Sequence, residues 1–210
     1  MPTLDLEEAI RRESGARHIA GLDEAGRGAV AGPVVAAAVI LPLDDPQRLA
    51  ALAAVDDSKQ LTPARREILY DLIIEHALAY AVGLVRASQI DRIGILPANA
   101  HAMQSALSRL EPGGDYLLLD GRMRLPRVPL PQRSVIRGDS LSLSIAAASI
   151  LAKVTRDRHM VEQDNHYPQY GFARHKGYCT AAHVAALEQH GPCAIHRHTF
   201  APIRPSLLGS

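Results

Sequence analysis

The pattern of apolar and polar positions along the chain predicts a mixed α/β fold. Five short apolar runs, bounded by glycine, proline or charged residues, are typical of buried strands. They cover residues 18–22, 34–41, 77–85, 115–120 and 133–136. The first run should end at Asp23, because a glycine-rich turn follows it. Two neighbouring strands followed by alternating helices and strands indicate a mixed central sheet flanked by helices.

Helix start and stop signals lie between these runs. Thr62 and Pro63 provide an N-cap and a first-turn proline for a helix that reaches about His76. Further helices are predicted from about 97 to 110, from 139 or 140 towards 160, and from 180 to about 190. Since no internal repeat or flexible linker is visible, we expect one domain, with a core at about residues 18–160 and a helical portion at about 161–210.

The composition fits a globular protein outside the membrane. Of the 210 residues, 47% are hydrophobic and 21% are charged, which is enough apolar surface to build a core. The longest uncharged stretch, 29–43, contains Pro33 and Pro42 and is shorter than the roughly twenty residues of a spanning helix. The charged N-terminus has no secretory pattern, and two cysteines are too few for a disulfide framework. We therefore expect a cytoplasmic protein.

The charge is distributed unevenly along the chain. Residues 1–120 contain 11 Lys and Arg against 17 Asp and Glu, whereas residues 121–210 contain 12 against 5 and seven of the ten histidines. Such asymmetry is typical of a nucleic-acid face supplied by one half of a protein. It is equally typical of two halves that neutralise each other across a packed interface, so charge alone leaves both interpretations open.

Asp23 and Glu24 are two adjacent carboxylates at the end of the first strand, and Gly26 and Gly28 follow them. Two unit charges about 4 Å apart repel by roughly 4 kcal/mol at an effective dielectric near 20, so a counter-charge is needed. A hard divalent cation is the simplest one. Because neighbouring strand residues point to opposite faces, the pair can share a metal only if the strand ends or bulges there.

Two further acidic residues lie at the ends of predicted elements. Asp120 ends the fourth strand, at the sheet edge where α/β proteins bind ligands. Asp139 is expected at the N-terminus of the long helix, where the helix dipole stabilises a carboxylate, although it can equally be a simple N-cap. If the four acids converge, their oxygen ligands favour Mg²⁺ or Mn²⁺ over zinc. Two such ions about 3.5–4 Å apart are suited to phosphodiester hydrolysis.

The order of several motifs resembles bacterial ribonuclease HII, a family of type 2 ribonucleases H. The segments that carry the resemblance are 23–28 (DEAGRG), 57–59 (DSK), 119–121 (LDG), 138–139 (GD), 144–154 (SIAAASILAKV), 175–178 (HKGY) and 196–202 (HRHTFAP). They cover about residues 18–204 and imply a ribonuclease H-like fold. Cys179 departs from the pattern, because the family is expected to have proline or another small residue there.

The resemblance implies an endonuclease that hydrolyses the RNA strand of RNA–DNA hybrids. It also implies incision on the 5′ side of ribonucleotides embedded in duplex DNA, which leaves 3′-hydroxyl and 5′-phosphate ends. Asp23, Glu24, Asp120 and Asp139 are then the ligands of two Mg²⁺ or Mn²⁺ ions. The backbone of Gly26, Arg27 and Gly28 senses the ribose 2′-hydroxyl, and Tyr178 packs on the neighbouring sugar.

Basic residues are the candidates for contacts with the phosphate backbone. They are Lys59, Lys153 and Lys176, together with Arg27, Arg156 and Arg174. Ser149 and Lys153 lie four positions apart and therefore share a helix face. Lys153 can equally pair with Asp157 on the same helix. We expect a monomer, and the tail from residue 202 to 210 is either a docking peptide for a partner such as a replication clamp or a frayed end.

Four other functions are considered. The glycines after the first strand resemble a dinucleotide-binding turn, but the third one, Gly32, is a position late and Pro33 favours a strand. Zinc binding through Cys179, Cys193, His196 and His198 has possible spacing but no CxxC motif. A serine hydrolase lacks its nucleophile turn. A binding module without catalysis gains nothing from four acids that repel phosphate.

Overall fold

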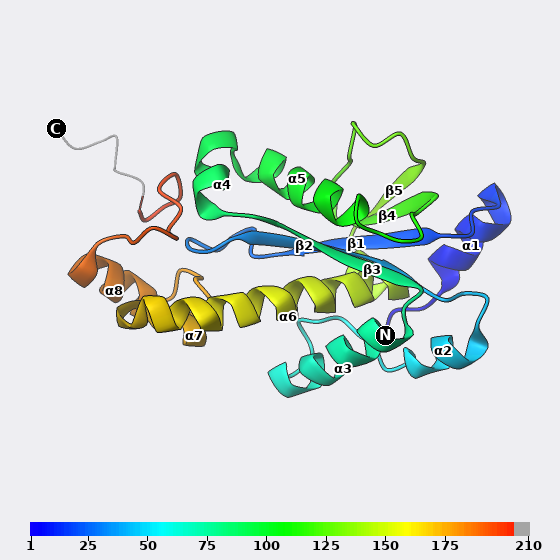
Figure 1. Cartoon of the computed structure of the whole chain (residues 1–210), viewed down its shortest axis with the longest axis horizontal. Helices are drawn as coiled ribbons and strands as arrows, with labels where there is room; N and C mark the ends of the chain where they lie inside the picture. The colour runs from blue at the N-terminus through cyan, green and yellow to red at the C-terminus, as the bar shows by residue number, and fades with distance from the viewer. Residues whose placement is uncertain (204–210) are drawn as a thin grey trace.

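The computed structural model describes residues 1–203, which fold around a five-stranded sheet with the order β3-β2-β1-β4-β5 (Figure 1). The antiparallel half is formed by β1, β2 and β3, and β4 and β5 continue from β1 in parallel. The strands are β1 (Ile19–Ala25), β2 (Val34–Ile40), β3 (Ala79–Val85), β4 (Tyr116–Asp120) and β5 (Gln132–Val135). The predicted mixed sheet flanked by helices is therefore confirmed.

Helices cover both faces of the sheet. In Figure 1, α4 (Ala87–Ile93) and α5 (Ile95–Leu107) lie on one face, and α3 (Pro63–His76) and α6 (Leu143–His166) lie on the other. The remaining helices are α1 (Asp5–Ser14), α2 (Pro46–Ala51), α7 (Phe172–His175) and α8 (Ala181–His190), with short 3-10 turns at Gly138–Ser140 and Pro168–Tyr170. Because both faces are covered, every residue of β2 is buried.

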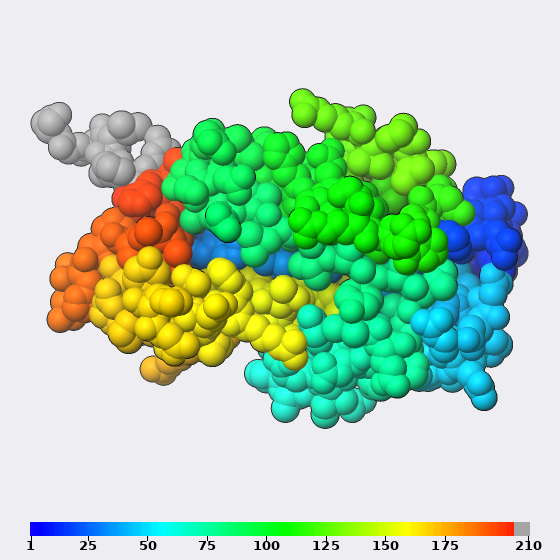
Figure 2. Space-filling model, viewed as in Figure 1, coloured from blue at the N-terminus to red at the C-terminus, as the bar shows by residue number. Residues whose placement is uncertain are grey.

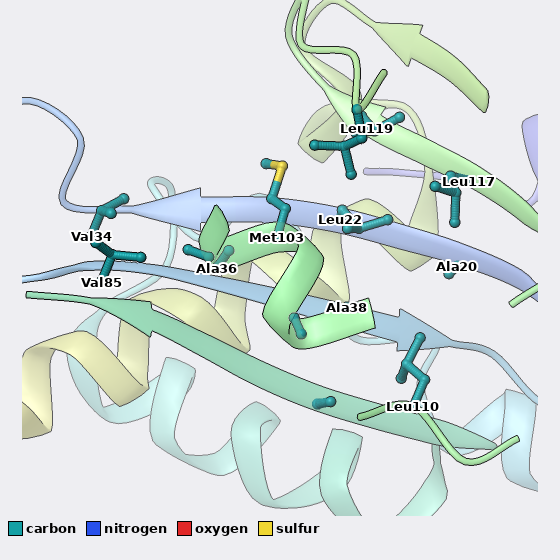
Figure 3. Close-up of a cluster of buried hydrophobic side chains, with 14 of the residues drawn as sticks. Ala20, Leu22, Val34, Ala36, Ala38, Val85, Met103, Leu110, Leu117 and Leu119 are labelled. Carbon is teal, nitrogen blue, oxygen red and sulfur yellow. The ribbon is translucent and has the colours of Figure 1, made fainter. Parts of the chain in front are cut away.

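The alternation of side chains along β1 divides the core into two layers. Leu22 packs with Ala36 and Met103 on the α5 side of the sheet, as Figure 3 shows. Gly21 and Asp23 lie on the opposite side, against α6, where a Cβ at Gly21 would lie 2.2 Å from the backbone carbon of Ser144. The close approach of α6 to β1 thus depends on small residues.

The long helix α6 begins and ends later than the sequence predicts. Ser142 is its N-cap, with a side chain that accepts a hydrogen bond from Ile145 N–H, and the helix continues to His166. Asp139 therefore does not lie at the N-terminus of α6 but in the preceding 3-10 turn. The apolar pattern could not locate this start, because Asp139 and the first turn of the helix are both buried.

Short helices are the elements that the sequence pattern missed. The acidic turn after β2 contains α2, which Asp45 caps by accepting hydrogen bonds from the N–H groups of residues 47 and 48. α1 packs through Glu7, which accepts hydrogen bonds from Ser142 and Ser144 at the start of α6. α4 was also missed, and α5 begins two residues before the predicted Pro97, because proline is tolerated in a first helical turn.

The C-terminal portion forms one end of the molecule, opposite α1 (Figure 2). Its centre is a cluster of aromatic and histidine rings in which Tyr170 stacks on Phe172 at 5.3 Å and His175 stacks on His183 at 4.4 Å. α6 reaches into this cluster through Met160. Among the helices of residues 1–203, none is long and apolar enough to cross a membrane.

Candidate active site

A cleft of about 360 Å³ opens where β1 and β4 end. Its lining includes Asp23, Glu24 and Asp120, the turn of residues 26–28, and Tyr178. β4 pairs with β1 only as far as Leu22, so the two acidic residues of β1 lie beyond that pairing. The structure therefore brings together residues that are separated by more than 150 positions in the sequence.

Asp23 is a deeply buried carboxylate of the cleft, with 5% of its surface exposed. Its Oδ1 accepts a hydrogen bond from the N–H of Glu24 at 2.7 Å. The pKa of Asp23 is raised well above its usual value, first by burial and then by the negative charges of Glu24 and Asp120. The fold thus keeps a repelled carboxylate in place, which is the electrostatic situation that a cation relieves.

Asp120 and Asp139 are connected through the turn that contains Gly138. Asp120 Oδ1 accepts a hydrogen bond from Gly138 N–H at 2.7 Å, and burial followed by the charge of Asp139 raises the pKa of Asp120. Asp139 is buried, and its Oδ2 accepts a hydrogen bond from Lys59 Nζ at 2.6 Å. Lys59, rather than a helix dipole, therefore compensates the charge of Asp139.

Glu24 lines the cleft although β1 neither ends nor bulges at this residue. The prediction that β1 ends at Asp23 is wrong, because Asp23 and Glu24 both pair with β2 and the strand continues to Ala25. Glu24 and Asp23 nevertheless line the same cleft, since β1 is unpaired on its β4 side there. Glu24 Oε1 also accepts a hydrogen bond from the guanidinium of Arg27 at 3.0 Å.

The donor set of this cleft fits a hard divalent cation. The four acids, of which all but Asp139 line the cleft, supply only oxygen, and burial together with neighbouring negative charges raises the pKa values of Asp23 and Asp120. Within residues 1–203, no three Asp, Glu, His or Cys side chains already lie in a geometry that holds one ion. Joint ligation of an ion would therefore require side-chain rotation.

The glycine turn and the tyrosine lie on the C-terminal side of the cleft. Gly26 has a φ of 87°, and a Cβ there would lie 1.9 Å from Nε of Arg156. Tyr178 is 37% exposed, and the guanidinium of Arg156 lies 5.2 Å from its ring centroid. The tyrosine thus presents part of its surface to the cleft while its ring is supported from within the protein.

The predicted phosphate-binding residues divide into two groups. Lys59, Ser149 and Lys153 line the cleft, and Lys153 Nζ also contacts Asp157 Oδ1 at 2.8 Å. Lys176 instead lines a neighbouring groove between α3 and α6, and its ammonium contacts the carbonyl of Ala173.

The phosphate-contact prediction for Arg156 is wrong. The side chain of Arg156 is fully buried and donates to backbone carbonyls, so it cannot reach a solvent-exposed phosphate. Arg174 is exposed. Sequence reasoning also missed Ser58, whose Oγ accepts a hydrogen bond from Ser149 Oγ at 2.5 Å, although the adjacent Lys59 indicated that this segment belonged to the site.

The geometry also argues against two of the competing functions, dinucleotide binding and zinc binding. The turn after β1 leads into the antiparallel strand β2 and not into a helix, so it cannot present a helix N-terminus to a dinucleotide. Cys193 Sγ lies 3.1 Å from His196 Nδ1, but the other nitrogen of His196 is bonded to His183, and Cys179 is exposed. The proposed zinc ligands are therefore not assembled in the part of the chain that the structure describes.

Together, the mixed sheet, its flanking helices and its structural neighbours define a protein of the ribonuclease H-like fold class. Ribonuclease H2 from Pyrococcus horikoshii has a TM-score of 0.75 and 29% identity, over 90% of this chain and 96% of that protein. The ribonuclease HII of Archaeoglobus fulgidus, solved in complex with PCNA, has a TM-score of 0.74 and 26% identity, over 88% and 95% of the two chains.

Residues 20–203 match the family described as Ribonuclease HII. The Ribonuclease HII of Chloroflexus aurantiacus is 52% identical over 208 residues, which cover 99% of this chain and 97% of the relative. The chain belongs to the ribonuclease HII family and is a ribonuclease H enzyme.

Proposed function

We propose that this protein hydrolyses the RNA strand of RNA–DNA hybrids and incises duplex DNA on the 5′ side of embedded ribonucleotides. The products are a 3′-hydroxyl and a 5′-phosphate. The observation that carries the proposal is that carboxylates from β1, β4 and the turn before α6 gather beside a glycine turn and a partly exposed tyrosine. We also propose that the enzyme is a monomer of one domain and that it acts in ribonucleotide repair in the cytoplasm.

Asp23, Glu24, Asp120 and Asp139 would hold two Mg²⁺ or Mn²⁺ ions. When bound, such ions supply a Lewis acid that lowers the pKa of the attacking water and stabilises the leaving oxygen. The role of the four carboxylates is to bind the ions and fix their positions. Lys59 Nζ lies 2.6 Å from Asp139 Oδ2. When Asp139 binds a metal ion, the ammonium group of Lys59 can contact a substrate phosphate instead.

Recognition of the ribonucleotide depends on one hydroxyl group. The 2′-hydroxyl is the local difference between RNA and DNA, and it both donates and accepts hydrogen bonds. Gly26 and Gly28 expose the backbone of the turn at the cleft wall, so their peptide groups can reach this hydroxyl without an intervening side chain. Tyr178 offers a flat surface to the next sugar, where a deoxyribose fits best.

A cleavage assay with three duplexes tests the proposal: all-DNA, DNA with one ribonucleotide, and a full hybrid. We expect cleavage of the last two only, loss of cleavage in EDTA, and recovery on addition of Mg²⁺ or Mn²⁺, because hard oxygen ligands prefer these ions. Cleavage of the all-DNA duplex at a comparable rate, or recovery with zinc alone, would contradict the proposal.

Tyr178→Ala is expected to slow incision at a single ribonucleotide by about tenfold, the effect of losing roughly 1.4 kcal/mol of stacking on the sugar. Because the ring is partly exposed, thermal stability should change little. Parallel cleavage and thermal unfolding assays with Tyr178→Phe as the control, which keeps the ring, separate the two effects. A loss of activity that merely follows a loss of folded protein would make Tyr178 a structural residue.

A contact with a replication clamp is the remaining partner hypothesis. The Archaeoglobus fulgidus neighbour was solved as a complex with PCNA. In this chain the tail of residues 202–210 is the candidate docking peptide, and residues 204–210 lie outside the described residues. The proposal for this chain is therefore limited to clamp binding through its C-terminal end, tested by co-elution of the full chain with a sliding clamp.

A further inference from the structure

Two fully buried arginines lie behind the glycine turn. Arg156 belongs to α6, and Arg197 lies in the segment that follows α8. Neither forms an ion pair with a carboxylate in the described part of the chain; both donate to backbone carbonyls instead. Buried cations are costly to maintain, and apolar residues often replace them without loss of stability. Their presence here calls for a role that an apolar side chain cannot perform.

Arg197 binds the carbonyls of the turn from the inside. Its Nη2 donates to the carbonyl of Gly26 at 2.7 Å, its Nη1 to that of Arg27 at 2.9 Å, and its Nε to that of Gly32 at 3.0 Å. The planar guanidinium presents these donors in a fixed geometry, which a lysine ammonium lacks. Three carbonyls on both sides of the turn are therefore held by one side chain.

These hydrogen bonds determine which way the peptide groups of the turn face. In a planar trans peptide the N–H points opposite to the C=O of the preceding residue. Because the carbonyls of Gly26 and Arg27 point inward to Arg197, the N–H groups of Arg27 and Gly28 point the other way. Within residues 1–203, neither N–H donates a hydrogen bond to the protein. Two unused donors thus lie on a turn that lines the cleft.

Arg156 connects the turn to the tyrosine. Its Nε and Nη2 donate at 3.0 Å to the carbonyls of Pro33 and Ala31, and its side chain fills the space where a Cβ of Gly26 would be. The same guanidinium lies 5.2 Å from the ring centroid of Tyr178. Burial and the charge of Arg156 lower the pKa of Arg197 to about 9, so Arg197 remains charged at neutral pH.

We propose that Arg197, supported by Arg156, is a positioning residue that orients the N–H groups of Arg27 and Gly28 toward the cleft and so sets the preference for ribose over deoxyribose. The proposal rests on the proposed function, in which this turn reads the 2′-hydroxyl. Arg197 does not touch the nucleic acid. It acts only through the backbone of the turn, and its loss should affect discrimination more than binding of the duplex as a whole.

The test compares the binding of two duplexes that differ by one hydroxyl group. Fluorescence anisotropy in EDTA gives the Kd for a DNA duplex with one ribonucleotide and for its all-deoxy equivalent. We expect the wild-type protein to bind the ribonucleotide duplex about five- to tenfold more tightly, the effect of about one net hydrogen bond. Arg197→Met should bring this ratio close to one without changing the Kd of the all-deoxy duplex, and Arg197→Lys should give an intermediate ratio.

Phe172→Leu is the matched control, because Phe172 belongs to the same C-terminal cluster but neither lines the cleft nor has a side chain that can hydrogen-bond to the turn. It should lower the melting temperature and leave the ratio unchanged. If Arg197→Met fails to fold in a thermal unfolding assay, Arg197→Lys carries the test. A wild-type ratio in the folded Arg197 variant would overturn this inference alone. A wild-type protein without ribose preference would overturn the proposed reading of the 2′-hydroxyl and the inference with it.

Discussion

Asp23→Asn is expected to slow cleavage of a duplex with one ribonucleotide by at least about 10²–10³-fold, the scale on which enzymes lose activity when one electrostatic group is removed. Asp120→Asn and Asp139→Asn should behave similarly, since each would remove a metal ligand. Asp71→Asn, which changes an exposed carboxylate on α3, is the control and should keep wild-type activity. Near wild-type turnover of any of the three site variants would remove that residue from the proposed ligand set.

The same substitution at Asp23 is expected to stabilise the metal-free protein. The pKa of Asp23 is raised in the folded state above the usual value of 3.8, because of burial and the charges of Glu24 and Asp120. Between these two pKa values the folded protein binds more protons than the unfolded one, so stability falls as the pH rises through this window. At neutral pH the asparagine removes this penalty.

Thermal unfolding in EDTA measures this gain. At pH 7 the melting temperature of Asp23→Asn should exceed that of the wild type, by about 2–4 °C for each kcal/mol of repulsion removed. Below pH 3 the advantage should disappear, because Asp23 is then protonated in both states. Added Mg²⁺ should raise the melting temperature of the wild type and have less effect on the variant. An asparagine variant that is less stable than the wild type at pH 7 would contradict the electrostatic description of the site.

Gly21→Ala is expected to cause a large loss of stability. Its Cβ would lie 2.2 Å from the backbone carbon and 2.5 Å from the backbone nitrogen and oxygen atoms of residues 144 and 145. Backbone atoms at the start of α6 cannot rotate away, so the helix must move off the sheet. Overpacking of a core costs about 1–3 kcal/mol, and this collision should reach or exceed the upper end of that range.

Gly113→Ala is the matched control, because a Cβ at Gly113 would meet nothing within 4 Å. A loss of about 3 kcal/mol corresponds to a fall of roughly 6–12 °C in the melting temperature of a protein of this size, whereas the control should change little. The displacement also separates Asp23 on β1 from the segment that carries Asp139, so activity should fall along with stability. Equal melting temperatures for the two alanine variants would show that α6 does not pack as closely on β1 as described.

Much of the fold could be predicted because the informative signals are local. Apolar runs gave all five strands within a few residues, and Thr62 is the N-cap of α3 as the sequence indicated. The boundary errors have physical reasons. β1 continues past Asp23 because the backbone of Asp23 and Glu24 still pairs with β2. α6 starts at Leu143 because its N-cap is Ser142 and not Asp139.

The sequence by itself determined which residues are the candidates for the chemistry. Four acids at element ends, a glycine turn after the first strand and a tyrosine near the C-terminus were all identifiable, and the ribonuclease HII motifs arrange them in one order. The tertiary structure alone decided how these residues are held. Lys59 compensates Asp139 from 80 positions away, and Arg197 donates a hydrogen bond to the carbonyl of Arg27, 170 positions away. Apolar periodicity reports burial along one element, whereas such contacts depend on which distant segments the packed sheet brings together.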